Sequence, residues 1–220
     1  MKRILAITAA LAALGAQATA TVTVVTNRAS INADATIDWG QFGVEGFGLI
    51  PAPAIGLTSG NVFAFKATGP RAFDRFDQGS LWNGNFSNGD KLISNYPDSG
   101  SITIRFARTL NAGGLQLENV NFGTHTYKVE AWDGLGVSLG SFTVSGTSAP
   151  TGDGSAVFLG VRSTVGDIAA LTYSIENGDG FQGFGMNYAS LETCNVVPEP
   201  ATMSLLGFGV AALVARRRKA

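Results

Sequence analysis

Short runs in which apolar and polar residues alternate recur through the middle of the chain. The clearest of them sets Ile102, Ile104 and Phe106 against Thr103 and Arg105. This period of two puts apolar side chains on one face of a strand and polar side chains on the other, as in a half-buried antiparallel strand. Outside the two ends, no window shows a sustained helical period. The pattern therefore predicts an all-β fold for the central region.

Several such runs are separated by turns rich in Gly, Asn, Asp and Ser. They cover residues 21–26, 61–67, 101–107, 125–132, 137–144, 156–161, 170–175 and 184–191. Asp133-Gly134 between two of them predicts a hairpin whose loop extends to Gly136. Because the sequence has no repeat at a fixed period, a propeller or solenoid is not expected. We expect an antiparallel, jelly-roll-like β-sandwich of about eight to ten strands.

The charges of the chain are segregated. The formal net charge is −1, but nine of the fifteen basic residues and fifteen of the sixteen acidic residues fall in residues 21–197, which gives that part a charge of −6. An acidic domain does not attract the phosphate backbone of nucleic acids, so we expect no nucleic-acid partner. The remaining basic residues lie at the two ends of the chain.

The first twenty residues have the three parts of a secretory signal peptide. Lys2 and Arg3 form a basic start, and residues 4–14 are apolar and rich in alanine. The small residues that follow predict cleavage after Ala18 or Ala20. We therefore expect this segment to engage the export translocon and the rest of the chain to leave the cytoplasm.

A second apolar segment, residues 201–215, lies close to the C-terminus and is followed by a basic tail. As a helix it would be about 22 Å long, at about 1.5 Å per residue. A bilayer core is about 30 Å thick, so the segment is short for a permanent span. The basic residues that follow such a segment remain on the cytoplasmic side of the membrane. We expect a transient inner-membrane stage, with an ordinary membrane anchor as the alternative.

The residues around this segment form a three-part pattern: a Pro-Glu-Pro triplet, an apolar run and a basic cluster. The triplet and the cluster are Pro198, Glu199, Pro200, Arg216, Arg217 and Arg218. The pattern over residues 196–219 resembles the PEP-CTERM sorting signal of exported bacterial proteins. The resemblance implies recognition of the triplet by an exosortase, removal of the tail and sorting to the outer surface or extracellular matrix. We divide the chain into a signal peptide (1–20), a β-sandwich (21–193) and a sorting segment (194–220).

A further, looser resemblance concerns the central domain. Residues 156–175, following the hairpin around Asp133, resemble β-sandwich domains common in PEP-CTERM proteins. Those domains have the general architecture of carbohydrate-binding modules. The resemblance implies a surface protein associated with polysaccharide, but a fold alone does not assign a ligand.

The sequence offers few groups for catalysis. His125 is the only histidine and Cys194 the only cysteine, so neither a His-dependent triad nor a zinc site of three or four His and Cys ligands can be assembled. Three pairs of carboxylates remain as candidates for glycoside hydrolysis. They are Asp74 with Asp77, Glu130 with Asp133, and Glu176 with Asp179. We expect no enzyme activity and no catalytic residues, with a glycan hydrolase or a purely structural matrix protein as alternatives.

We predict neither a cofactor nor a metal ligand set, but a structural calcium ion stays open. Calcium takes oxygen ligands from Asp, Asn and loop carbonyls and needs neither cysteine nor histidine. The loop that begins at Asp153 and the one that carries Asn177 and Asp179 are the richest in such groups. Neither has the spacing of an EF-hand.

Three tryptophans, Trp39, Trp82 and Trp132, can stack on sugar rings if they are exposed. Trp82 is the strongest candidate for ligand contact, because LWNGNFSNGD reads as a polar, glycine-rich loop rather than as core. Trp132 ends a strand pattern and fits the core. We therefore expect an exported, surface-sorted β-sandwich that associates with polysaccharide or the cell envelope.

Overall fold

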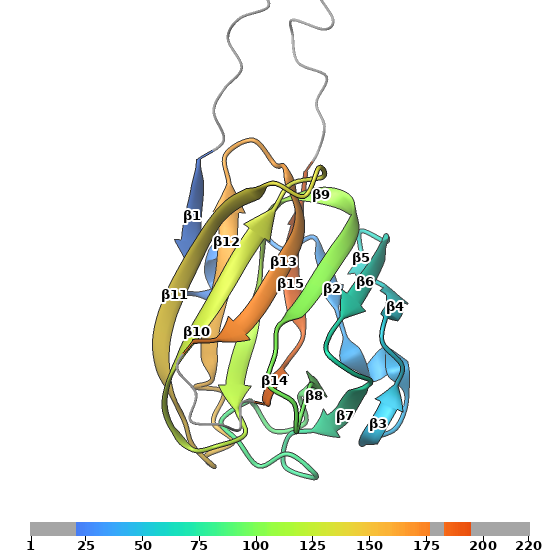
Figure 1. The fold of residues 1–220 in the computed structure, drawn as a ribbon, viewed down its shortest axis with the longest axis vertical. Helices are drawn as coiled ribbons and strands as arrows, with labels where there is room; N and C mark the ends of the chain where they lie inside the picture. Colours follow the sequence, from blue (N-terminus) through green and yellow to red (C-terminus); the bar gives the residue numbers. More distant parts are fainter. Residues whose placement is uncertain (1–20, 177–182, 195–220) are drawn as a thin grey trace, which may run out of the picture.

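The computed structural model describes residues 21–176 and 183–194. Within them lie fifteen strands and two short 3₁₀ helices, and every strand pair is antiparallel (Figure 1). The predicted all-β class is therefore confirmed. The predicted signal peptide and residues 195–220 of the predicted sorting segment lie outside the described residues. Inside them, no helix is long and apolar enough to cross a membrane.

The fifteen strands include several that the alternating pattern predicts and several that it misses. Their bounds are β1 Val22–Val25, β2 Ala35–Ile37, β3 Gly46–Ile50, β4 Ala54–Leu57, β5 Ser59–Gly60, β6 Ala64–Thr68, β7 Phe73–Asp77, β8 Lys91–Ser94, β9 Ile102–Asn119, β10 Gly123–Trp132, β11 Ser138–Ser148, β12 Val157–Ser163, β13 Ile168–Ile175, β14 Phe184–Met186 and β15 Ala189–Thr193. The 3₁₀ helices are Arg28–Ser30 and Trp39–Phe42.

The long strand β9 connects the two layers of the sandwich. Its first part pairs with β6 and β13, and this layer continues through β10 to β11 on one side and to β4 on the other. Its second part pairs with β12 on one edge and with β15 and β14 on the other. Beyond these, β1 joins β12, β2 joins β15, and β8, β7 and β3 follow β14. The jelly-roll-like sandwich is thus one hydrogen-bonded sheet folded on itself.

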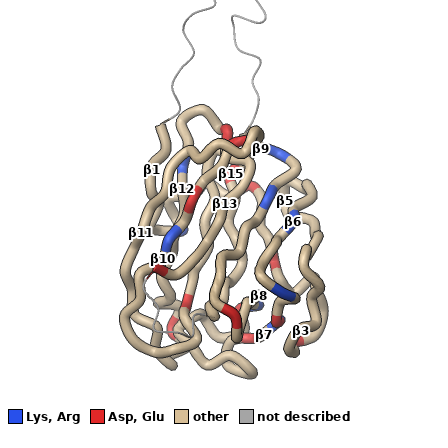
Figure 2. The backbone as a smooth tube through the Cα atoms, viewed as in Figure 1, with Lys and Arg blue, Asp and Glu red and all other residues tan. Residues whose placement is uncertain are grey.

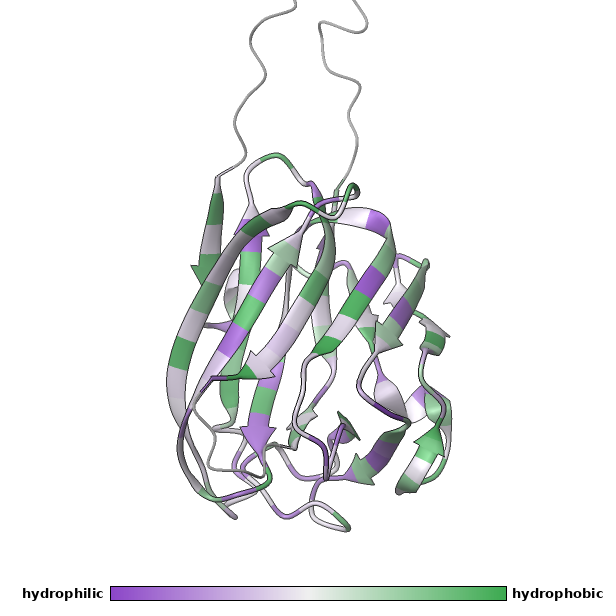
Figure 3. Cartoon of the chain, in the orientation of Figure 1, coloured by the Kyte–Doolittle hydropathy of each residue, from purple (hydrophilic) through white to green (hydrophobic). Residues whose placement is uncertain are grey.

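The apolar faces of the two layers form the core. One row of core residues runs across β10, β13, β9 and β6: Ala131, Leu171, Ile104 and Ala67, which pair in register and are all buried. The next row along the same strands faces solvent, because neighbouring side chains on a strand point to opposite faces. Figure 3 shows this alternation of apolar and polar residues along β9, β10 and β13.

Two glycines allow β9 and β12 to approach closely. A Cβ atom on Gly160 would lie 2.7 Å from the carbonyl oxygen of Gly113, and one on Gly114 would lie 2.7 Å from the Cα of Gly160. No larger residue fits either position without a shift of the backbone. These glycines therefore fix the pairing at the centre of the second layer.

The predicted hairpin after β10 is confirmed. The Asp133 amide donates to Val137 O at 3.0 Å, and Asp133 Oδ1 accepts from the amides of Leu135 and Val137. Gly136 takes a φ of +81° in the loop. Asp133 therefore has a turn-forming role.

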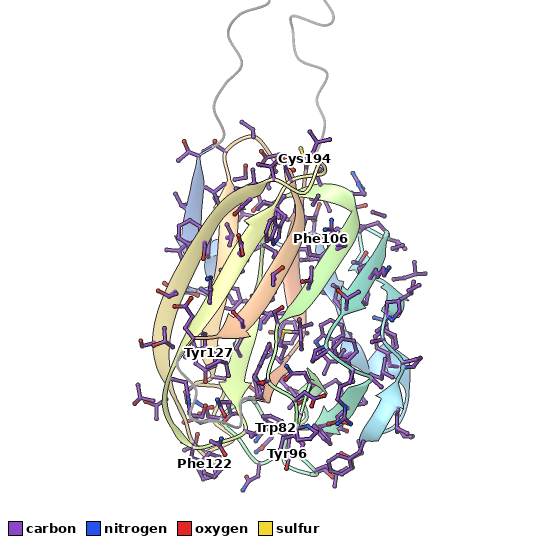
Figure 4. The ribbon with its side chains drawn as sticks, viewed as in Figure 1. Trp82, Tyr96, Phe106, Phe122, Tyr127 and Cys194 are labelled. Carbon is purple, nitrogen blue, oxygen red and sulfur yellow. The ribbon has the colours of Figure 1, made fainter. Side chains whose placement is uncertain are left out.

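Both ends of the described chain lie at one end of the sandwich. In Figure 1 the start of β1 and the end of β15 are at the top. Cys194, the last described residue and the first of the sorting segment, is also labelled there in Figure 4. The opposite end is formed by the loops that connect β7 to β8, β8 to β9 and β9 to β10.

Candidate functional site: a cleft at the end distal to the sorting segment

A cleft of about 360 Å³ opens among the loops at the end of the sandwich far from Cys194. Figure 4 labels Trp82, Tyr96 and Phe122 close together at this end. We call it the distal cleft. Its lining residues are Phe47, Phe76, Leu81, Trp82, Asn83, Tyr96, Glu118, Asn119, Val120, Asn121 and Phe122. The site therefore combines apolar and aromatic walls with amide side chains and one carboxyl group.

The turn between β9 and β10 presents Phe122 to solvent. Asn119 Oδ1 accepts a hydrogen bond from the Asn121 amide at 2.7 Å, which closes an Asx turn. Gly123 follows with a φ of +127°, a conformation that favours glycine. His125 Nε2 lies 2.8 Å from Asn121 O and supports the turn from β10. Phe122 is held at its tip and is 55% exposed.

A chain of packed rings supports the opposite wall. Phe47 on β3 meets Phe76 on β7 edge to face, with ring centroids 5.1 Å apart. Phe76 packs on Trp82 at 5.8 Å, and Trp82 packs on Phe86 at 6.3 Å. Phe76 and Phe86 are buried, whereas Phe47 is 62% exposed. An exposed aromatic ring therefore stands on a rigid, buried base.

Trp82 itself is only 7% exposed, so the prediction that its loop exposes it is wrong. The polar residues of the loop make hydrogen bonds inside it instead of facing solvent. Gln78 Nε2 donates to Gly84 O at 2.7 Å, and the Gly84 amide donates to Gln78 Oε1 at 3.2 Å. The loop thus folds back and drives the indole inward, where it lines the floor of the distal cleft. Ligand contact through Trp82 stays a prediction.

Glu118 lies beneath the cleft and is 1% exposed. Its carboxylate accepts from Trp82 Nε1 at 2.9 Å and from the Asn85 amide at 3.0 Å. Among the described residues it forms no ion pair with a basic side chain. Burial is the main cause that raises the pKa of Glu118 to about 6, with the charge of Asp153 as a smaller contribution. The residue ties the floor of the cleft to the end of β9.

The acidic pairs singled out from the sequence have structural partners. Asp77 pairs with Arg75 and Lys91. Asp74 is buried, accepts from the Gly48 amide at 2.5 Å and lies 3.9 Å from Arg71. Burial raises the pKa of Asp74.

The described members of the other two pairs are engaged in the same way. Glu130 accepts from Ser138 Oγ at 2.8 Å, and Asp133 caps its hairpin. Glu176 pairs with Lys128 at 3.0 Å, while Asp179 lies outside the described residues. The arrangement of these carboxylates supports the fold.

The candidate calcium loops are only partly described. Asp153 is exposed, and its side chain accepts from the Ser155 amide at 3.0 Å. Its backbone forms an isolated antiparallel β-bridge with Ser87. Hydrogen bonds to Ser155 hold the pKa of Asp153 below its usual value. Asn177 and Asp179 lie outside the described residues. Across residues 21–176 and 183–194, no group of three or more His, Cys, Asp or Glu side chains gathers around a possible metal position.

Trp39 and Trp132 have opposite environments. Trp39 is fully buried and donates from Nε1 to Asn187 O at 2.8 Å. Trp132 was expected in the core, but it lies on the outer face of β10 and is half-buried. Its neighbour Ala131 takes the core position, because the strand alternates.

The C-terminal pattern can now be compared with known families. Residues 196–219 match the family model of the PEP-CTERM protein-sorting motif. The chain carries a PEP-CTERM motif. The match confirms the resemblance and implies export, membrane-anchored sorting and processing by an exosortase-type enzyme. The PEP-CTERM triplet and basic cluster themselves lie outside the described residues.

Other comparisons concern the domain that precedes the PEP-CTERM motif. No curated protein matches the sequence. Similar solved structures include CsCBM6-3 from Clostridium stercorarium in complex with cellobiose, with 13% identity and a TM-score of 0.32 over 58% of this chain and 86% of that one. Another is a DUF4465 family protein from Bacteroides caccae, with 8% identity and a TM-score of 0.39 over 78% and 100%. Similarity at this level identifies neither a ligand nor an activity.

Proposed function

We propose that this chain is an exported, surface-sorted, non-enzymatic β-sandwich protein that binds a neutral glycan in the distal cleft. It would thereby associate with the extracellular polysaccharide matrix or the cell envelope. The observation that carries the proposal is the pair of exposed aromatic rings, Phe47 and Phe122, on the walls of a cleft that faces away from the sorting segment.

The chemistry of the cleft suits an uncharged sugar. Sugar rings present apolar C–H faces, which pack on aromatic rings, and hydroxyl groups, which need hydrogen-bond partners. The walls supply Phe47, Tyr96 and Phe122, and the exposed side chain of Asn83 supplies an amide. No Lys or Arg is among the lining residues, and the buried carboxyl of Glu118 opposes an anionic ligand. We therefore favour a neutral glycan.

The position of the cleft supports a role in display. The described domain ends at Cys194, at the end of the sandwich opposite the cleft. A domain held through its sorting segment would therefore present the distal cleft outward, away from the membrane. A ligand in the surrounding matrix could reach it without obstruction from the bilayer.

The absence of enzyme activity is part of the proposal. Glycoside hydrolysis needs two carboxyl groups on either side of the bond that breaks. Glu118 is the only Asp or Glu among the residues that line the cleft, and its two oxygens hold Trp82 and Asn85. The cleft is therefore better suited to binding than to hydrolysis.

Replacing Phe122 with Ala should weaken binding of neutral oligosaccharides by about tenfold or more, which corresponds to about 1.4 kcal/mol. The reason is loss of an exposed ring from one wall, while the fold keeps its buried ring stack. The measurement is a glycan array followed by calorimetric titration of the best ligand. Leu135→Ala is the matched control, because Leu135 is 92% exposed in the hairpin at the other end of β10. Equal affinity of Phe122→Ala and the unmodified protein would contradict the proposal.

A further inference from the structure

Strand register places a row of four residues on the outer face of the first layer. Trp132 on β10 lies opposite Ala170 on β13, Ala170 lies opposite Arg105 on β9, and Arg105 lies opposite Lys66 on β6. The adjacent row on these strands is the core row that begins with Ala131, so this one faces outward. Neighbouring strands are about 4.8 Å apart, so the row is about 14 Å long. We call it the outer row.

The indole of Trp132 lies along the sheet. Its Nε1 donates to Thr172 Oγ1 at 3.0 Å, on the neighbouring strand β13. Ala170, which stands directly opposite Trp132 on the same face, has 0% exposure although it points outward. The indole therefore extends from β10 to β13, beside Ala170, and the half-buried ring keeps part of its surface in solvent.

The other half of the outer row is cationic. Arg105 and Lys66 are exposed and face each other across β9 and β6. Neither forms an ion pair or a side-chain hydrogen bond with any residue that the structure describes. Lys128, on the same face, is instead paired with Glu176 at 3.0 Å. Figure 2 shows basic residues near β9 and β6. Like charges directly opposite on neighbouring strands disfavour the fold, so this pair is not explained by stability.

Polar residues border the outer row on the same face of the layer. Thr172 on β13 is in register with Thr103 on β9, which is in register with Thr68 on β6. The Oγ1 atoms of Thr103 and Thr172 are 2.9 Å apart. The same bordering row continues to Glu130 on β10, which is opposite Thr172 and accepts from Ser138 Oγ at 2.8 Å.

We propose that the outer row is a second glycan-binding surface, which takes an acidic polysaccharide. A sugar ring packs on the exposed part of Trp132, and carboxylates of the following sugars pair with Arg105 and Lys66. An aromatic ring near two unpaired cations fits a polymer whose sugar rings have apolar faces and whose carboxylates are negatively charged. The planar guanidinium of Arg105 matches a carboxylate well. The surface is separate from the distal cleft and independent of the neutral ligand proposed there.

The test is titration of the exported protein with polygalacturonate, alginate and hyaluronan at low and moderate salt. We expect Arg105→Gln and Trp132→Ala each to weaken binding of at least one polymer by about tenfold, and salt to weaken it further. Lys128→Gln is the matched control, since it removes one positive charge from the same face but from an existing ion pair. Phe122→Ala should leave this binding unchanged, which separates the outer row from the distal cleft.

Two results would overturn the proposal. One is no binding of any of the three polymers at low salt. The other is a general attraction between charges. In that case polyphosphate would bind equally well, Trp132→Ala would not change binding, and Lys128→Gln would weaken binding as much as Arg105→Gln. Trp132→Phe keeps a ring at the position, so retained binding in this variant together with loss in Trp132→Ala shows that the ring acts by contact and not through folding.

Discussion

Protein that lacks Arg216–Lys219 should accumulate with its C-terminal segment uncleaved, or away from its normal location, and almost none should be processed. The apolar segment 201–215 would be about 22 Å long if it formed a helix, against about 30 Å for a bilayer core. Without basic residues on the cytoplasmic side, little holds this short segment in position for cleavage. Replacing Glu199 should have the same result, because the PEP-CTERM triplet is what the sorting enzyme is expected to recognise. Fractionation and intact-mass analysis measure both effects.

Ser204→Ala is the control for these variants. It changes a mildly polar residue inside the apolar segment and leaves the triplet and the basic cluster intact, so processing should be normal. Normal processing in both the Glu199 variant and the deletion would remove the exosortase interpretation. The mass of the mature protein also reports whether the signal peptide is cleaved after Ala18 or Ala20.

The second large effect concerns Glu118 and pH. The pKa of Glu118 is about 6 in the folded protein, against 4.5 as its ordinary value. Between these values the folded state binds more protons than the unfolded state, so the free energy of unfolding falls as pH rises. The contribution is fully present below about pH 4.5 and is lost above about pH 6. The expected loss is up to about 2 kcal/mol, at 1.36 kcal/mol per pKa unit.

Urea unfolding from pH 4 to pH 7.5 measures this loss, with Glu118→Gln as the reference. The variant has its own cost at all pH values. Trp82 Nε1 and the Asn85 amide donate to different oxygens of Glu118, and glutamine replaces one of these oxygens with an NH₂ group, which cannot accept. That cost is independent of pH, so the difference between the two proteins isolates the titration. Parallel stability profiles for the two proteins would show that Glu118 is not the group responsible.

Strands with one buried and one exposed face could be predicted from the sequence. Strands that contain glycines at a close approach, or buried charged residues, could not. β1, β10, β11 and the first part of β9 follow the alternating pattern. The second part of β9 carries Gly114 where β12 approaches it closely, and a Cβ atom on Gly113 would lie 3.1 Å from Leu171 and 3.2 Å from Leu191. These two glycines hide the strand signal. The prediction misses β7, with the sequence FDRFD, because its charged residues have partners in the fold: Asp74 accepts from the Gly48 amide, and Asp77 pairs with Arg75 and with Lys91 on β8.

One predicted strand, 184–191, is divided into β14 and β15. The break lies at Asn187, which is fully buried in a polar network. Its amide donates to Asp90 Oδ2 at 2.8 Å and to Gln116 Oε1 at 2.7 Å, and its Oδ1 accepts from Arg28 Nη2 at 2.8 Å. These partners come from three separate parts of the chain, so a single segment of sequence does not reveal the break.

The candidate site was the least predictable part. The distal cleft is assembled from β3, β7, the end of β9 and three loops, and its exposed rings, Phe47 and Phe122, stand in ordinary local sequence. The loop around Trp82 was identified correctly as polar, but its polar groups bond to one another and bury the ring. The prediction that Trp132 fits the core is wrong, because successive side chains on β10 alternate between the core and the outer face. Alternation from Tyr127, Val129 and Ala131 would have placed it outside.

The most direct test of the proposed function is NMR titration of the exported protein with the neutral oligosaccharides that an array selects. The account predicts that amide shifts cluster at Phe47, Asn83 and Phe122, at the end of the sandwich opposite Cys194. Shifts confined to the end that carries Cys194, or no shift at the distal cleft with any neutral oligosaccharide, would contradict it.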